Sequence, residues 1–215
     1  CYTTLQNAAS LYCQAINRDP NTGAIAPPLY AQVNLANTGA AKTQGVDIAG
    51  QYNFDLDGGW LTDQSNLAIS TNWTWTTEFT LTPVKELANI KNECVGAFGS
   101  TCGSPIPALK GSTRLTWTDG PLTASLRHRF IGGVTDDRYL LPFRKVAATP
   151  ALNTLTNPLI PDFHFFDITA GYDLTEEVRV SGGVNNVLNI GPPIVGSAAN
   201  GNVTYPATYD PLGQS

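Results

Sequence analysis

The cysteines of this sequence have the spacing that most directly suggests chemistry. They form two local couples, Cys1 with Cys13 and Cys94 with Cys102, each in a stretch rich in Gly, Asn, Ser and Thr. Four cysteines allow three disulfide pairings, and short separation along the chain favours the two local bridges. Oxidised cysteines are typical of extracellular and periplasmic proteins. A zinc site is the alternative, but zinc needs closely spaced cysteines or a histidine beside them.

The two histidines, His128 and His164, belong to no recognisable catalytic or metal-binding motif. The sequence contains no G-x-S-x-G elbow and no Gly-rich phosphate loop after a strand, and neither histidine has an acid partner beside a nucleophile. His128 falls on the apolar side of an alternating segment, and no second metal ligand is expected near it. The sequence therefore predicts a protein that is not an enzyme and that holds no cofactor or metal.

One segment also resembles part of a calcium site. Asp19, Asn21 and Gly23 resemble half of a calcium-binding loop. No further carboxylates follow them, so a six-residue turn is favoured. Asp136 and Asp137 are interpreted in the same way.

Two further sets of residues are candidates for contact with a solute. Six charged residues fall on the polar side of alternating segments: Glu78, Arg114, Arg127, Arg129, Asp167 and Arg179. They predict either an electropositive wall that guides an anionic substrate or a cross-strand ladder of opposed charges. Aromatic and basic residues in the long connections are suited to stacking and polar contacts with a ligand; they include Tyr2, Tyr12, Arg138, Tyr139, Phe143 and Arg144.

The composition excludes several classes of protein. The 215 residues carry 17 acidic and 12 basic side chains and a net charge of −5, which argues against nucleic-acid binding. Only 13% of the residues are charged, about half of the ~25% usual for soluble domains. No run of about 18 apolar residues could form a membrane helix, but a membrane strand needs only about 9 to 11 alternating residues.

Strict alternation of apolar and polar residues is the dominant pattern and predicts β-strands. In residues 67–81, Leu67, Ile69, Trp73 and Trp75 alternate with Ala68, Ser70, Asn72 and Thr74. The same pattern predicts strands at residues 45–54, 111–117, 121–130, 165–174 and 177–186, and a less regular one at 29–35. Helical patterns are limited to short turns at residues 4–11 and 84–89. The chain is therefore expected to be all-β.

The connections between these strands alternate in length. Short turns follow Phe54, Trp117 and Tyr172, whereas residues 82–110, 136–161 and 189–215 form long connections rich in Gly, Pro, Asn and Thr. Short periplasmic turns and long outer loops are typical of outer-membrane β-barrels. Aromatic residues near the short turns and again toward the long loops predict two interfacial girdles.

Three segments resemble TonB-dependent outer-membrane receptors. VNLANTGAAKTQGVDIAGQYNF resembles a strand of that family, SGGVNNVLNIGPP its penultimate strand, and PATYDPLGQS the loop before its last strand. The resemblance covers essentially all 215 residues, in order. It implies an antiparallel up-and-down meander from the C-terminal part of a 22-stranded transmembrane barrel. Residues 1–215 would form one barrel domain that lacks the final strand and the N-terminal plug.

The resemblance also implies a function. Such receptors import a scarce solute, such as a ferric siderophore, vitamin or oligosaccharide, across the outer membrane of Gram-negative bacteria. The expected partners are outer-membrane lipid, the small-molecule ligand and an inner-membrane energy-coupling complex that acts through the plug; the charged wall could then also contact the plug. Two alternatives share the pattern: a passive porin, and a secreted disulfide-bonded β-sandwich that buries its apolar faces between two sheets.

Overall fold

The computed structural model describes residues 5–25, 31, 37, 39–143, 157–195, 204, 205, 208 and 209. The chain forms two compact units: the first contains Cys1–Ala41 and Thr82–Lys91, and the second contains Lys42–Leu81 and Asn92–Ser215. No helix in the described part of the chain is long and apolar enough to cross a membrane. Most of the strand predicted at residues 29–35 lies outside the described residues, together with Cys1, Tyr2 and Arg144.

The first unit holds two short helical elements and a polar turn. Helix α1 spans Leu11–Gln14, so it begins where the predicted turn at residues 4–11 ends, and the 3-10 helix η1 spans Lys85–Leu87 as predicted. The carboxylate of Asp19 accepts the backbone N–H groups of Asn21 and Thr22, at 2.8 and 2.9 Å. These bonds form the compact turn that the sequence favoured.

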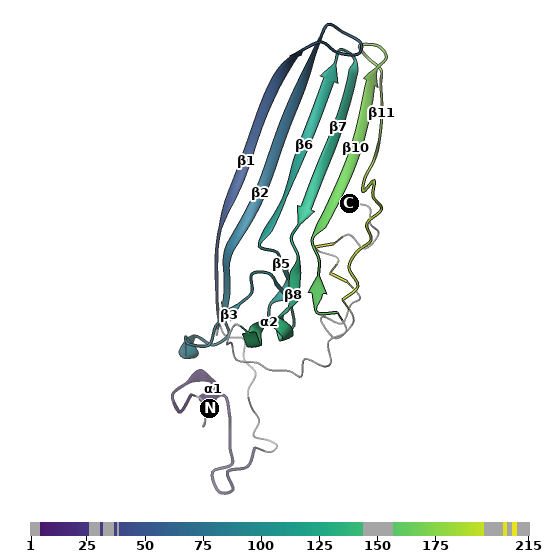
Figure 1. Ribbon diagram of the computed structural model, residues 1–215. Coiled ribbons are helices and arrows are strands. Elements are labelled where there is room, and N and C mark those ends of the chain that lie inside the picture. Colours follow the sequence, from purple (N-terminus) through teal and green to yellow (C-terminus); the bar gives the residue numbers. More distant parts are fainter. Residues whose placement is uncertain are drawn as a thin grey trace. The chain divides into compact units, whose positions relative to one another are not determined.

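The second unit is built on one large sheet (Figure 1). Its strands are β1 (Ala40–Asp57), β2 (Gln64–Thr82), β6 (Leu109–Asp119), β7 (Leu122–Ile131), β10 (Phe163–Asp173) and β11 (Arg179–Val184), in that order across the sheet, and the short β3 (Asn92–Glu93) pairs with β2. The pairs from β2 to β11 are antiparallel. The predicted meander of six or seven strands is thereby confirmed for six, and most of the seventh, at residues 29–35, lies outside the described residues.

The register of these strands places the apolar residues on one face. One row across the sheet runs from Ile69 through Leu115, Leu126 and Ile168 to Val184. Leu126 is 42% exposed and Ile168 is 47% exposed, so this face is not packed against another protein layer in the described part of the chain. A β-sandwich would bury these side chains, so the structure does not support that alternative.

A second, smaller sheet forms within the long connections. Its strands are β4 (Ala97–Gly99), β5 (Gly103–Ile106), β8 (Val134–Asp136) and β9 (Leu159–Ile160), in the order β5-β4-β8-β9. Strands β4 and β8 are parallel and join two different connections. The sequence predicted long connections here and missed these strands, because strands of two to four residues are too short to show a period of two.

The buried core lies on the polar face of the large sheet, at the end where the long connections lie. Phe98 from β4 packs with Val134, Ile160, Phe163 and Phe165, and with Tyr205 and Tyr209 from the C-terminal segment. Phe163 and Phe165 point away from the apolar face because they alternate with His164 and Phe166 along β10. The connections at this end are therefore anchored to β10 by a small hydrophobic core, next to helix α2 (Asp137–Phe143).

Candidate functional site

A disulfide lies in the long connection between β2 and β6. Cys94 and Cys102 are bonded, with 5.5 Å between their Cα atoms, as the sequence predicted. Cys13 is also disulfide-bonded, and Cys1, its expected partner, lies outside the described residues. The disulfide at Cys94 holds the residues that lead into β4 and β5.

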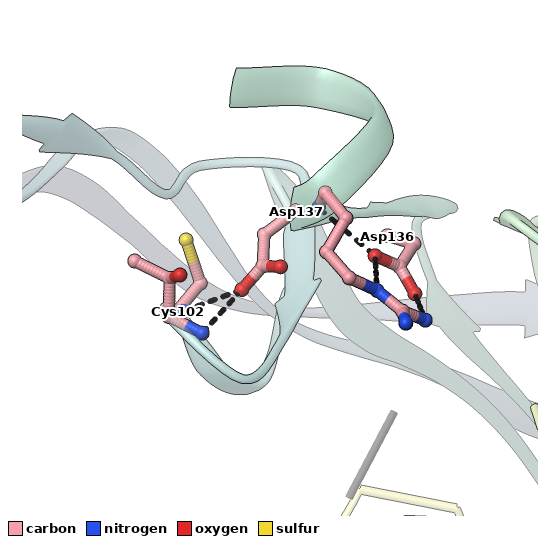
Figure 2. A network of polar contacts seen from close by, with 5 residues as sticks. Cys102, Asp136 and Asp137 are labelled. Atoms are coloured by element: carbon pink, nitrogen blue, oxygen red, sulfur yellow. Dashed lines mark hydrogen bonds and ion pairs between the residues drawn. The ribbon is translucent and has the colours of Figure 1, made fainter. Parts of the chain in front are cut away.

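A buried carboxylate ties this disulfide loop to helix α2 (Figure 2). One oxygen of Asp137 accepts the backbone N–H groups of Thr101 and Cys102, at 2.6 and 2.8 Å. The neighbouring Asp136 binds the guanidinium of Arg138 through two bonds of 3.0 and 2.8 Å. Arg138, a candidate ligand contact, is therefore held by its own chain. The sequence assigned both aspartates to a simple turn and missed this role, which depends on partners 35 residues away.

Burial raises the pKa of the Asp137 carboxyl above its usual 3.8. The native state then binds a proton that the unfolded state releases over part of the acidic range. We expect the free energy of unfolding to fall as the pH rises from about 3.8 through the raised pKa, and to level off above it. Asp137→Asn cannot ionise and should lose this dependence. Urea unfolding across the acidic range, with the rate of reduction of the Cys94–Cys102 disulfide as a local probe, measures it.

The control for this prediction is Asp63→Asn, because Asp63 is an exposed carboxylate in the turn between β1 and β2. It should retain the wild-type pH dependence. An Asp137→Asn protein whose unfolding follows pH as the wild type does would refute the assignment.

The polar face of the large sheet carries all six charged candidates. Arg129 on β7 binds Asp167 on β10 through two bonds of 2.9 and 3.0 Å, and both side chains are largely buried. The same carboxylate accepts the backbone N–H of Asn186 at 2.9 Å. Asn186 has a φ of 50°, and its side chain exchanges two hydrogen bonds with the backbone of Ile190. Asp167 therefore joins β7, β10 and the turn that follows β11.

Three more candidates also bind partners within the chain. Glu78 accepts bonds from Lys42 and Gln44 on β1, at 2.7 and 2.6 Å. Arg179 lies 3.4 Å from Asp173, and Arg114 donates to the hydroxyl of Ser125 at 3.1 Å. Glu78 and Arg179 therefore lie beside opposite charges, whereas Arg114 binds a neutral hydroxyl. The choice between a guiding wall and a ladder of opposed charges stays a prediction.

Two cations on this face differ from the others. The side chains of Arg127 and Lys110 form neither an ion pair nor a hydrogen bond with any residue that the structure describes, whereas Arg114 at least binds Ser125. Together with Arg129 they line a shallow hollow of about 310 Å³. Its other side chains include Asn72, Thr74, Ser112 and Phe165, and the guanidinium of Arg129 lies 5.0 Å from the centre of the Phe165 ring. The sequence missed Lys110 because it immediately precedes the alternating segment at residues 111–117.

The hollow offers positive charge, hydroxyl and amide groups and an aromatic ring on one polar surface. Lys and Arg attract anions, and Arg binds carboxylates and phosphates through paired hydrogen bonds. The hollow therefore carries groups that can bind an anion.

The two histidines lie on the opposite, apolar face. Nε2 of His128 is 3.0 Å from Nδ1 of His164, and the two rings stack beside Phe130 and Phe166. The expectation that no second ligand lies near His128 is wrong, because the register brings β7 and β10 together there. Within the described ranges, no group of three His, Cys, Asp or Glu side chains could hold a metal ion.

The remaining loop candidates are only partly described. The hydroxyl of Tyr12 is buried and has no hydrogen-bond partner among the described residues, and Tyr139 on α2 is 39% exposed. Phe143 ends α2, but its side chain lies outside the description, as do Tyr2 and Arg144. Their predicted contact with a ligand stays a prediction.

These features together define a class of protein. A single antiparallel sheet has one exposed apolar face and one polar face, short turns at one end and long connections at the other. This is the wall of an outer-membrane β-barrel.

The comparison with family models gives the particular family. The model described as "TonB dependent receptor-like, beta-barrel" matches residues 2–187, and the chain belongs to that family. Searches of curated proteins and of solved structures returned no match. The family consists of receptors and transporters rather than enzymes, and membership implies the outer membrane of a Gram-negative bacterium and the binding of a ligand.

Proposed function

We propose that this chain forms part of the barrel wall of an outer-membrane receptor that imports a scarce solute with energy from an inner-membrane complex. The solute would be a ferric siderophore, a vitamin or an oligosaccharide. The observation that carries the proposal is the separation of the large sheet into an apolar and a polar face, in a chain of this receptor family. The apolar face would contact lipid, and the polar face would line the passage.

The sheet edges favour a larger barrel. Strands β1 and β11 each pair on one side only within the described part, and all the residues of both strands are exposed. Exposed edges carry backbone N–H and C=O groups that need partners in a membrane. We therefore propose that residues 1–215 are one part of a barrel domain of 22 strands, which other strands close and a plug fills.

The hollow around Lys110 and Arg127 would contact the anionic part of the solute. Arg129 is committed to Asp167, so its main contribution is to the structure of the wall. The proposal thus assigns solute contact to Lys110 and Arg127, and structural support to the other charged candidates.

Uptake by cells that produce the full-length receptor tests this proposal. Labelled ferric siderophores, a vitamin and oligosaccharides would each be supplied to a strain with the receptor and to a strain without it. We expect uptake of one of these classes to require both the receptor and an energised inner membrane. Reversing one charge at a time, with Lys110→Glu in one variant and Arg127→Glu in another, should reduce that uptake about tenfold in each case, which corresponds to about 1.4 kcal/mol.

The matched control is Arg179→Glu, which changes the net charge equally on the same face but away from the hollow. It should leave uptake within about twofold of the wild type. Uptake that persists when the inner membrane is de-energised would indicate a passive porin and refute the proposal. Equal effects of the charge reversals at the hollow and at Arg179 would refute the assignment of Lys110 and Arg127.

A further inference from the structure

The apolar face is hollowed at the end where the short turns lie. The groove there has a volume of about 770 Å³, within the range of roughly 300–1,000 Å³ typical of small-molecule sites. Six of its lining residues carry the argument: Trp60, Leu67, Trp117, Leu122, Ala124 and Ala170. None of the side chains that line the groove is charged.

Small side chains form the floor of this groove. Ala124 on β7 pairs directly with Ala170 on β10, and Trp117 on β6 pairs with Ala124 from the other side. The neighbouring row toward the middle of the sheet carries larger side chains, among them Leu126 and Ile168. The alanines therefore form a depression between larger apolar side chains.

One side of the groove is formed by the turn that contains Trp60. Trp60 is 86% exposed, yet its ring packs edge-on against Trp117, with 5.4 Å between the ring centres. The buried carboxylate of Asp119 fixes this turn, because it accepts the backbone N–H groups of Trp60, Leu61 and Thr62 as well as the hydroxyl of Thr62. The three backbone donors point at one anion, so the turn is held in a single conformation.

Gly59, the residue before Trp60, leaves room for the Asp119 carboxylate. A Cβ atom on Gly59 would lie 2.4 Å from an oxygen of the Asp119 carboxylate, so a side chain there would displace the carboxylate. This side of the groove is thus preformed, and it holds the Trp60 ring over the depression formed by the alanines.

We propose that this groove binds an acyl chain of a phospholipid from the inner leaflet of the outer membrane. The inference rests on the proposed membrane location, since the groove is continuous with the face that would contact hydrocarbon. Short turns of outer-membrane barrels lie on the periplasmic side, which faces the inner leaflet. Tryptophan favours the membrane interface, where its ring meets the chains and its N–H meets the headgroups. The lining is mostly apolar and carries no charged side chain, which favours a hydrocarbon chain over a charged solute.

Retention of phospholipid by the full-length receptor tests this inference. The receptor would be purified from outer membranes, washed in phospholipid-free detergent and weighed by native mass spectrometry. We expect the wild type to retain a phospholipid. Ala170→Leu, which fills the floor, should reduce the retained fraction at least tenfold. Val46→Phe adds bulk to the same face outside the groove and should retain as much as the wild type.

Trp60→Ala provides a second variant that removes this side of the groove without adding bulk, and it decides the question if Ala170→Leu does not fold. Folding is judged by the heat-dependent gel mobility of the barrel.

A wild type that retains no phospholipid would overturn the inference, as would two folded variants that retain it fully. A dimeric mass without lipid would assign the groove to a second copy of the chain and overturn it too. Failure of the proposed location would instead appear as absence from the outer-membrane fraction.

Discussion

Replacing Asp167 with alanine is expected to destabilise the barrel wall by about 3–5 kcal/mol, the usual cost of removing one partner of a buried ion pair. The side chains of Arg129 and Asp167 are only 16% and 6% exposed, so alanine would leave a buried guanidinium without its anion. The N–H of Asn186 would lose its acceptor as well. Urea unfolding of the full-length receptor in lipid vesicles measures the change.

The matched control lies on the same strand. Asp173 pairs with Arg179 at 3.4 Å, but these side chains are 44% and 50% exposed, so Asp173→Ala should cost less than about 1 kcal/mol. If both substitutions had equal effects, the assignment of Asp167 as the residue that joins β7, β10 and the following turn would be wrong.

A charge introduced on the apolar face should be nearly as costly. Ile168 lies at the middle of β10 and is 47% exposed. If its side chain contacts hydrocarbon, Ile168→Arg should destabilise the receptor by about 2–4 kcal/mol, the range for arginine at the bilayer midplane. The same unfolding assay in vesicles provides the measurement.

Thr169→Arg is the natural comparison, because Thr169 is the next residue of β10 and lies on the polar face. It should cost less than about 1 kcal/mol, as is usual for exposed positions. The prediction would be contradicted if arginine were tolerated at position 168 as well as at position 169.

The sequence was sufficient to predict the large sheet. Each long strand carries its own alternation, and a wrong register by one residue would move every apolar side chain to the other face. The predicted strand at residues 67–81 lies within β2, and the one at 121–130 differs from β7 by one residue at each end. The disulfide between Cys94 and Cys102 was predictable for a similar reason, because its partners are close in the sequence.

The features that the sequence did not reveal depend on distant partners. Strands β4 and β8 are three residues each and pair across two connections. Asp119 and Asp137 look like ordinary turn residues until the fold brings backbone N–H groups 57 and 35 residues away toward them. His128 and His164 likewise meet only through the register of β7 and β10. Such contacts arise from tertiary structure, which no local period encodes.

The solute-contact residues illustrate the same limit. Arg127 and Arg129 are both cations on the polar side of one strand, and the sequence gives them equal weight. The structure separates them, because only Arg129 lies within bonding distance of Asp167. The distinction changes the experiment, since a substitution at Arg129 would affect folding as well as uptake.

Spin labels on β7 and β10 test the central claim most directly, namely that the apolar face touches membrane hydrocarbon. Single labels at positions 126 and 168 would be compared with a label at position 169, which is exposed on the polar face, in the full-length receptor in vesicles. We expect the labels at 126 and 168 to collide with oxygen dissolved in the bilayer, and the label at 169 to collide with a water-soluble nickel chelate. Labels at 126 and 168 that are shielded from both reagents would place this face inside a protein core and contradict the account.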